Sequence, residues 1–333
     1  MVISLVSACG GDGPKEPVSE TDTTVVADTV EVTLSGLSSG GYMAVQTHLA
    51  LGEQVGGVAV IAGGPYHCAQ GSIGRALGAC LTGEGIDLPA LHAFAEEAAG
   101  SGEIAPLSSL AEDRVWLFQS PADGVVQPAV GRALEGFYAR YVGESGVAMV
   151  DDVPSAHGWP TLSTGNACDQ IGGAYLNACG YDGAGAALAH LYGPLVARAE
   201  DADAAGALSE VEIADWLPPG SSLAPAAFAY VPDDCADAAA GCRLHISFHG
   251  CQQGADAIGE QFAAGAGLNE WAGPNRIVVL YPQVSPSLTN PLGCWDWWGY
   301  TGGDYDVREG KQVLAVARLI EAYAKGQLLT SLE

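Results

Sequence analysis

The sequence has few basic residues. Its 12 lysines and arginines are set against 39 aspartates and glutamates, which gives a formal net charge of −27 over 333 residues. Proteins that bind nucleic acid neutralise phosphates with lysine and arginine, and anionic membrane surfaces attract basic segments. A chain with only the three lysines Lys15, Lys311 and Lys325 suits neither task. We therefore predict no nucleic-acid partner and no adsorption to an anionic membrane surface.

Long hydrophobic runs are also absent. No apolar stretch approaches the roughly 18 residues that a membrane-spanning helix needs, so we predict no transmembrane segment. Charged residues make up only 15 % of the chain, whereas hydrophobic residues make up 48 %. This composition excludes a disordered chain, because there is ample apolar surface to bury. The length fits one large α/β domain or two small ones.

The closely spaced cysteine pairs typical of metal sites are missing, although the chain has nine cysteines. We expect no metal ion and no cofactor. Eight cysteines form loop-sized pairs by proximity, which is one of 105 possible pairings. Each short bridge would add roughly 3 kcal/mol of stability by restricting the unfolded chain. Disulfides persist in oxidising compartments, so we predict export. The pairs are Cys68 with Cys80, Cys168 with Cys179, Cys235 with Cys242, and Cys251 with Cys294.

The ninth cysteine lies near the start of the chain. Val6-Ser7-Ala8-Cys9 resembles the end of a bacterial lipoprotein signal, in which Cys9 would carry the lipid. The segment is too short for a full signal peptide and has no basic region before it. Residues 1–9 are thus either a truncated export or lipoprotein signal, or a short exported leader with an incidental thiol. Residues 10–29 are predicted to form a flexible tether. Residues 30–333 then form one domain, either extracellular or on the outer surface.

Strands alternate with helices along this domain. Such alternation predicts a doubly wound α/β fold with a mainly parallel sheet and helices on both faces. The expected strands are residues 30–34, 55–62, 114–118, 147–150, 244–248 and 277–281. The expected helices are residues 42–50, 88–99, 129–141, 184–200, 255–271 and 307–324.

A candidate nucleophile lies between the first strand and the first helix. Gly36-x-Ser38-x-Gly40 has the spacing of a nucleophile elbow, whose tight turn admits only small residues two positions either side of the serine. Ser39 does not fit, because Leu37 lies two residues before it. The helix that follows would offer backbone N–H groups to an oxyanion. The alternative is a Gly/Ser-rich turn without chemistry.

A serine nucleophile needs a histidine base and an orienting carboxylate. Asp123 follows the strand at 114–118, and His157 follows the strand at 147–150. Both would therefore lie at the carboxyl edge of the sheet, whereas Asp113 precedes its strand and would face the opposite edge. The remaining histidines fall within predicted helices or strands, beside a disulfide, or before a glycine with another role. The alternative for Asp123 is an ordinary turn aspartate.

Phe248-His249-Gly250-Cys251 follows a later strand and is typical of an esterase oxyanion loop. In the usual hydrolase order this loop precedes the nucleophile strand, but here it follows that strand by more than 200 residues. A circular permutation would explain the order and keep the geometry. We expect the Ser39 and Cys251 amides to form the oxyanion hole. The alternative is a plain turn at the end of a strand.

Several motifs together resemble one family. They resemble the circularly permuted (type 2) catalytic domain of extracellular short-chain poly(3-hydroxyalkanoate) depolymerases, particularly the single-domain fungal form. The similarity runs from about residue 28 to the C-terminus. The motifs are Ser35-Gly-Leu-Ser-Ser-Gly-Gly-Tyr-Met-Ala44, Ala62-Gly-Gly-Pro-Tyr66 with Cys68, His157 with Pro160-Thr161, Tyr181-Asp-Gly-Ala-Gly185, His249-Gly-Cys251, Leu280-Tyr-Pro-Gln283 and Gly293-Cys-Trp-Asp-Trp297.

The resemblance implies a triad of Ser38, Asp123 and His157, with the Ser39 and Cys251 amides as the oxyanion hole. It also implies the Cys251–Cys294 disulfide and a substrate crevice lined by Trp297. The chain departs from the family in having Gln119-Ser-Pro-Ala before the aspartate. It also shows no linker to a substrate-binding module, so an apolar patch near the crevice would adsorb to the polymer.

The aromatic segment of Trp295, Trp297, Trp298 and Tyr300 could form an apolar wall for an aliphatic ester chain. We expect at least two of these residues to be core and Trp297 to be the exposed one. Trp295 and Tyr42 are further candidates for substrate contact.

Taken together, the motifs predict an exported, monomeric serine hydrolase that cleaves poly(3-hydroxybutyrate)-like polyesters into hydroxyacid monomers and oligomers. Two alternatives stay open. One is a feruloyl-type or general carboxylesterase on a related scaffold. The other is a surface lipoprotein that binds polymer without cutting it.

Overall fold

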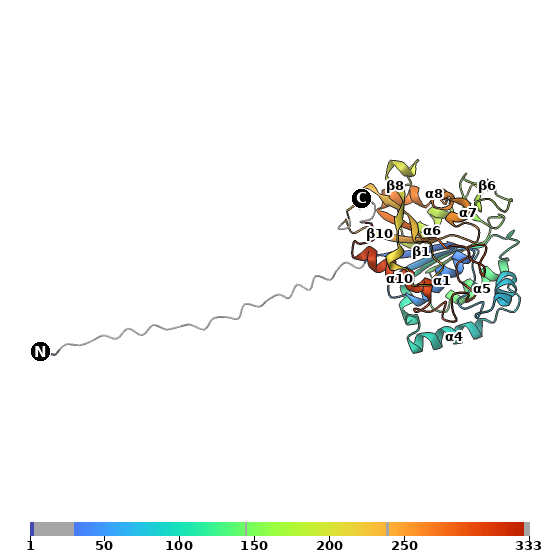
Figure 1. The fold of residues 1–333 in the computed structure, drawn as a ribbon, viewed down its shortest axis with the longest axis horizontal. Helices are drawn as coiled ribbons and strands as arrows, with labels where there is room; N and C mark the ends of the chain where they lie inside the picture. Colours follow the sequence, from blue (N-terminus) through green and yellow to red (C-terminus); the bar gives the residue numbers. More distant parts are fainter. Residues whose placement is uncertain (3–29, 144, 238–239, 330–333) are drawn as a thin grey trace.

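The structure is a computed structural model that describes residues 1–2, 30–143, 145–237 and 240–329. The predicted lipid site Cys9 and the predicted tether 10–29 lie outside the described residues. The described chain from Val30 onward forms an α/β sandwich, with helices covering both faces of a central sheet (Figure 1).

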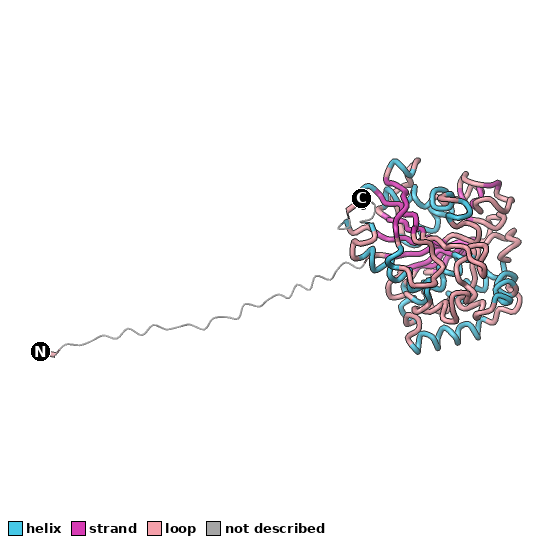
Figure 2. The backbone as a smooth tube through the Cα atoms, in the orientation of Figure 1, coloured by secondary structure: helices cyan, strands magenta, loops and turns pink. Residues whose placement is uncertain are grey.

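The central sheet has eight strands in the order β4-β3-β2-β1-β10-β11-β9-β8. The six strands from β4 to β11 run parallel, and β9 and β8 continue the sheet in antiparallel fashion. Figure 2 shows these strands at the centre of the molecule. Their bounds are β1 Val32–Leu37, β2 Gly57–Ile61, β3 Arg114–Phe118, β4 Val147–Val150, β8 Gly206–Glu212, β9 Ala226–Pro232, β10 Arg243–Phe248 and β11 Ile277–Tyr281.

Strand β10 lies beside β1 although it comes much later in the chain. The two strands pair in parallel, with Gly36 opposite Phe248. The turn that follows β1 and the turn that follows β10 therefore emerge next to each other at the carboxyl edge of the sheet. This is the edge at which open α/β sheets place their ligand sites.

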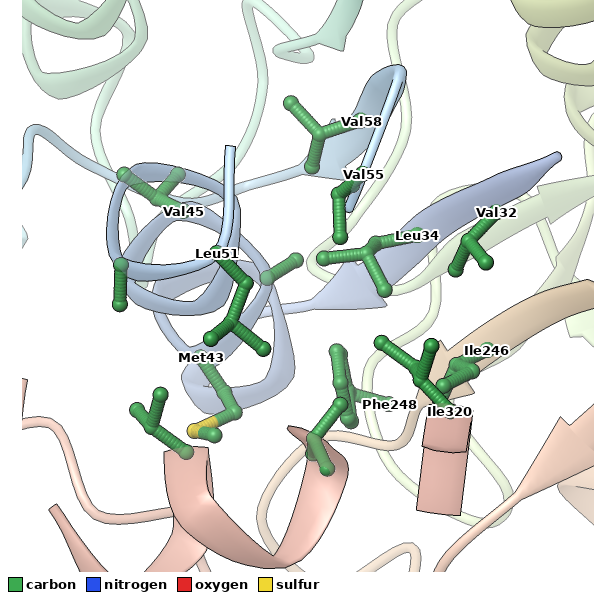
Figure 3. Packing of buried hydrophobic residues seen from close by; sticks show 14 of the residues in the cluster. Val32, Leu34, Met43, Val45, Leu51, Val55, Val58, Ile246, Phe248 and Ile320 are labelled. Atoms are coloured by element: carbon green, nitrogen blue, oxygen red, sulfur yellow. The ribbon is translucent and has the colours of Figure 1, made fainter. Parts of the chain in front are cut away.

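The helices cover the two faces of the sheet with separate apolar cores. Helices α1, α4, α5 and α10 pack on one face, and α6, α8 and α9 pack on the other (Figure 1). Figure 3 shows the first core, to which α1 contributes Met43 and Val45, β1 contributes Leu34 and β10 contributes Phe248. The helices are α1 Ser39–Ala50, α2 Ile73–Leu77, α3 Ala79–Thr82, α4 Leu88–Ser101, α5 Pro128–Tyr138, α6 Gly183–Tyr192, α7 Ala255–Ile258, α8 Gln261–Gly265, α9 Leu268–Ala272 and α10 Lys311–Ala324.

Three predicted helices differ from the structure, and glycine accounts for each difference. The expected helix 255–271 is three short helices, because Gly259 and Gly267 take left-handed φ values of 61° and 83°. The expected helix 184–200 ends at Tyr192, where Gly193 has φ 81°. The expected helix 307–324 begins only at Lys311, after the extended Gly310.

Other elements were not predicted. Strands β8 and β9 form an antiparallel pair at one end of the sheet. A separate three-stranded sheet is built from β5 Trp159–Thr161, β6 Asn166–Ala167 and β7 Leu176–Ala178. This small sheet directly follows His157 and therefore supports the loop that carries it.

The four predicted disulfides are confirmed: Cys68–Cys80, Cys168–Cys179, Cys235–Cys242 and Cys251–Cys294. The last one joins the turn after β10 to the tryptophan-rich segment. Among the described helices, none is both long enough and apolar enough to cross a bilayer.

Candidate active site

Ser38 occupies the tight turn between β1 and α1. Its backbone has φ 58° and ψ −118°, a conformation that a serine adopts only when its surroundings hold it there. The Ser38 amide donates to the carbonyl of Ile61 at 2.9 Å. A Cβ atom on Gly36 would lie 2.1 Å from the carbonyl oxygen of Gly40, and one on Gly40 would lie 2.2 Å from that of Phe248. The two glycines are therefore sterically required, as a nucleophile elbow demands.

His157 and Asp123 form a buried pair. The imidazole Nδ1 donates to Asp123 Oδ2 at 2.7 Å, and the two residues are 6 % and 5 % exposed. The other carboxylate oxygen, Oδ1, accepts the amides of Val125 and Val126 at 2.8 and 3.0 Å. Since Nδ1 is engaged with the carboxylate, Nε2 is the ring nitrogen left for proton transfer. Ser38 and His157 line the same cavity.

Gln119-Ser-Pro-Ala122, which differs from the pattern of the family that the sequence resembles, ties the aspartate loop to the histidine loop. Ser120 Oγ donates to the carbonyl of Ser155 at 2.7 Å and accepts the Ser155 amide at 2.7 Å. Gln119 Nε2 donates to the carbonyl of Val126 at 2.8 Å. These bonds fix the loops before and after Asp123, so the departure is compatible with the His157–Asp123 geometry.

The amides of Ser39 and Cys251 are the predicted oxyanion donors. Ser39 is the first residue of α1, and the first amides of a helix have no partner within it. Cys251 lines the cavity, and among the loop and turn hydrogen bonds of the described residues none is donated by its amide. The pairing of β1 with β10 brings the two segments together. The Cys251 amide is thus available to a ligand in the cavity, whereas Ser39 is 1 % exposed and is not among the lining residues.

Ser38, His157 and Cys251 line an apolar cavity of about 400 Å³. Its lining includes aliphatic side chains that are unusually exposed: Ile73 is 49 %, Leu77 62 %, Ile171 58 % and Leu292 48 % exposed. We call these four residues the apolar rim. Sequence analysis did not single them out, because an isolated exposed aliphatic residue carries no signal until the fold gathers several together.

The tryptophan segment contributes to the cavity differently from the prediction. Trp297 lines it but is only 5 % exposed, and its ring stacks on Tyr42 at 4.3 Å between centroids. The more exposed neighbour is Trp298, which also lines the cavity. The expectation that Trp297 would be the exposed tryptophan is therefore wrong, since stacking on Tyr42 buries one of its faces. The expectation that at least two of these aromatics are core is confirmed by Trp295 and Trp297.

Two other predicted contact residues lie behind the cavity wall. Trp295 is fully buried against Phe248 and is not among the lining residues. Tyr42 is 3 % exposed, and its hydroxyl donates to the carbonyl of Cys80. Burial raises the pKa of Tyr42 far above its ordinary value. Both residues pack behind the cavity wall, so we do not propose them as substrate contacts.

Asp296 organises the tryptophan segment and was missed by sequence analysis. It is fully buried, and its carboxylate accepts the amides of Gly299, Tyr300 and Thr301 at 2.7, 2.9 and 2.8 Å. The Thr301 hydroxyl donates to it at 2.6 Å. Burial raises the pKa of Asp296, and these hydrogen bonds oppose the increase. The segment is thus wrapped around one carboxylate.

Within the part of the chain that the structure describes, no group of three or more His, Cys, Asp or Glu residues could hold a metal ion.

Comparisons with known proteins point to one family. No protein-family model matches the chain. A poly(3-hydroxybutyrate) depolymerase of Delftia acidovorans is 38 % identical over 302 residues, which is 90 % of this chain and 60 % of that protein. This chain therefore spans less than two thirds of that relative. A polyhydroxybutyrate depolymerase of Talaromyces funiculosus is 32 % identical over 310 residues, covering 89 % of this chain and 90 % of that protein.

Solved structures of PHB depolymerases are also similar to this chain. The crystal structure of PHB depolymerase from Penicillium funiculosum has a TM-score of 0.82 and 31 % identity, and covers 90 % of this chain and 96 % of that one. A PHB depolymerase variant complexed with R3HB trimer has a TM-score of 0.82 and 30 % identity, and covers 91 % and 98 % of the two chains. With a fungal relative that is 32 % identical and matched over 90 % of its length, this chain belongs to the polyhydroxybutyrate depolymerase family.

Proposed function

We propose that this protein is an exported serine hydrolase that cleaves the ester bonds of poly(3-hydroxybutyrate)-like aliphatic polyesters. One observation carries the proposal: Ser38, Cys251 and the Asp123-bound His157 all line one apolar cavity. Among the described loop and turn hydrogen bonds, none is donated by the Cys251 amide. The names of the relatives agree with this substrate class.

In the proposed reaction His157 Nε2 takes the proton of the Ser38 hydroxyl as Oγ attacks the ester carbonyl carbon. The oxygen of the tetrahedral intermediate takes the negative charge, which the Ser39 and Cys251 amides stabilise. The intermediate collapses with loss of the alkoxide, which leaves as an alcohol after His157 returns the proton. Water then hydrolyses the acyl-enzyme by the same steps, releasing a hydroxyacid end and regenerating Ser38.

The apolar rim supports action on a solid polymer. A neutral polyester offers no charge for recognition, so adsorption depends on apolar contact. Ile73, Leu77, Ile171 and Leu292 expose such surface around the cavity. Trp297 and Trp298 supply the aromatic wall for the ester chain inside it.

Export is supported by the four disulfides, which persist in oxidising compartments. The position of β10 beside β1 supports a circular permutation of the α/β-hydrolase fold, since the oxyanion loop then takes its usual place. A lipid anchor at Cys9 and a monomeric state complete the proposal. Mass spectrometry of the mature N-terminus and size-exclusion chromatography with light scattering would test these two points.

The decisive experiment is product analysis after incubation with a poly(3-hydroxybutyrate) film. We expect wild type to release 3-hydroxybutyrate and its oligomers, and Ser38→Ala to release none above background. Wild-type-like clearing by Ser38→Ala would refute the assignment. Faster turnover of feruloyl or short p-nitrophenyl esters with no attack on the film would favour a carboxylesterase. If the protein binds the film, turns over no ester and is not labelled at Ser38 by a fluorophosphonate, a polymer-binding protein is favoured.

A further inference from the structure

The turn after β10 contains a histidine that the proposed reaction does not use. His249 is fully buried, and its ring makes two hydrogen bonds to the backbone. Nε2 accepts the amide of Val284 at 3.2 Å, and Nδ1 lies 2.7 Å from the carbonyl oxygen of Gly250. A ring nitrogen that accepts an N–H bond carries no proton, so the single proton of the neutral ring is on Nδ1. His249 therefore donates to Gly250.

The surroundings keep this ring neutral and immobile. Burial lowers the pKa of His249 to about 4, so the ring carries no charge at neutral pH. The Trp295 ring lies 5.7 Å away between centroids. Gly254 packs so closely that a Cβ atom there would lie 3.3 Å from His249 Cε1. The imidazole thus has one tautomer and one orientation.

The acceptor of the His249 proton belongs to the same peptide unit as the Cys251 amide. In a trans peptide the carbonyl and the N–H point in opposite directions within one plane. A hydrogen bond that fixes the Gly250 carbonyl on one side therefore fixes the Cys251 N–H on the other. A donor at the carbonyl also polarises the peptide unit, which makes its N–H a stronger donor.

Gln253 holds the preceding peptide unit in a similar way. Its Oε1 accepts the Gly250 amide, and its Nε2 donates to the carbonyl of Ala174 at 2.6 Å. Gln253 is 1 % exposed. The two peptide units that flank Gly250 are thus each fixed by a buried side chain.

We propose that His249 is a positioning residue that aims the Cys251 amide at the oxyanion, and that Gln253 assists it by fixing the preceding peptide unit. His249 touches neither the substrate nor the reacting atoms. It acts through the Gly250 carbonyl. This inference rests on the proposed function, since it assigns a role within the same site.

Two substitutions separate positioning from mere packing. In His249→Asn, the side-chain NH2 lies near the former position of Nδ1 and can still donate to Gly250. In His249→Gln, the amide reaches toward Val284 but no longer toward Gly250. We expect His249→Gln to lower kcat on a soluble p-nitrophenyl ester by about 10²-fold with KM nearly unchanged, as for loss of one oxyanion donor. We expect the kcat of His249→Asn to be at least tenfold higher than that of His249→Gln.

A ligand-binding measurement distinguishes the transition state from the ground state. An alkyl boronic acid forms a tetrahedral adduct with Ser38, so its affinity should fall in His249→Gln by about the same factor as kcat/KM. The affinity for a 3-hydroxybutyrate trimer, measured on the Ser38→Ala background with and without His249→Gln, should stay within twofold. Equal losses for boronic acid and trimer would overturn the proposal.

His245 provides the matched control. It is likewise fully buried and neutral, and burial lowers its pKa to about 3. Its ring bonds Thr33 and Ser35 instead of the oxyanion turn. His245→Gln should therefore lower the melting temperature without the kcat-specific loss. If His249→Gln fails to fold, Gln253→Leu tests the same turn and should also lower kcat and boronic acid affinity together.

The outcomes also separate this inference from the proposed function. A wild type that turns over no ester refutes the proposed function itself. An active wild type, with His249→Gln retaining more than half of wild-type kcat and boronic acid affinity, refutes only the role of His249.

Discussion

The polar centre of the site, formed by Ser38, the His157–Asp123 pair and the turn that contains His249, is built in the opposite way to the apolar rim. In the centre, the Asp123 carboxylate accepts three hydrogen bonds, and the His249 ring makes two. On the rim, side chains such as Leu77 and Ile171 are 62 % and 58 % exposed. Stabilising a developing charge requires preorganised dipoles, whereas contact with an irregular solid requires only apolar area. Turnover should therefore depend on single hydrogen-bonding atoms in the centre, whereas adsorption to polymer should depend only on the apolar area of the rim.

The largest effect is expected from Asp123→Asn. The two backbone amides of Val125 and Val126 would take the Asn oxygen, so its NH2 group would face His157. His157 Nδ1 would then have to accept, the proton would move to Nε2, and Nε2 could no longer take the serine proton. We expect kcat on a soluble ester to fall on the order of 10⁴-fold, measured under saturating substrate.

Asp113→Asn is the matched control for that substitution. Asp113 pairs with His48 through a similar 3.0 Å bond at the opposite edge of the sheet. We expect stability to fall and the kcat of the folded enzyme to stay near that of wild type. Comparable kcat losses in both variants would show that any buried His–Asp pair affects turnover through the fold alone.

An intermediate effect is expected where the two regions meet, at Asp296. In Asp296→Asn, an NH2 group replaces one carboxylate oxygen and faces the N–H and O–H donors of the tryptophan segment. This repulsion loosens the wall formed by Trp297 and Trp298. A hydrogen bond to a charged group contributes about 1.5–3 kcal/mol. We expect KM for 3-hydroxybutyrate oligomers to rise about tenfold, with kcat on p-nitrophenyl acetate within twofold of wild type.

The exposed Asp304 lies in the same part of the chain, and its carboxylate accepts no hydrogen bond from the residues that the structure describes. Asp304→Asn therefore controls for loss of one negative charge. Its steady-state constants on oligomers should match those of wild type. A tenfold KM effect in both variants would indicate that charge, not the shape of the wall, controls oligomer binding.

Local signals in the sequence predicted the parallel core and the contact between His157 and Asp123. A buried apolar strand, a Gly-x-Ser-x-Gly turn and a helix are consecutive, so Ser38 could be located without knowledge of the rest of the chain. Asp123 and His157 were also assigned to strand ends, and in a parallel sheet all such ends share one edge. The structure pairs these two residues as that reasoning requires.

Features that depend on distant partners were predicted poorly. The burial of Trp297 is decided by Tyr42 of α1, and no pattern near Trp297 reveals this contact. The breaks in the expected helix 255–271 depend on Gly259 and Gly267 adopting left-handed backbone, which helical periodicity does not register. The rim likewise exists only because α2 and the loops around Ile171 and Leu292 converge.

The smallest effect is expected from Leu77→Ser on the rim. The side chain is 62 % exposed, so the free energy of unfolding should change by less than about 0.5 kcal/mol. Burying a leucine against polymer yields at most about 2 kcal/mol, so adsorption to a poly(3-hydroxybutyrate) film should weaken only several-fold, with soluble-ester kinetics unchanged. Val196→Ser is the matched control, because Val196 is 63 % exposed but does not line the cavity. If both variants lose adsorption equally, the whole surface binds the polymer and the rim is not a distinct region.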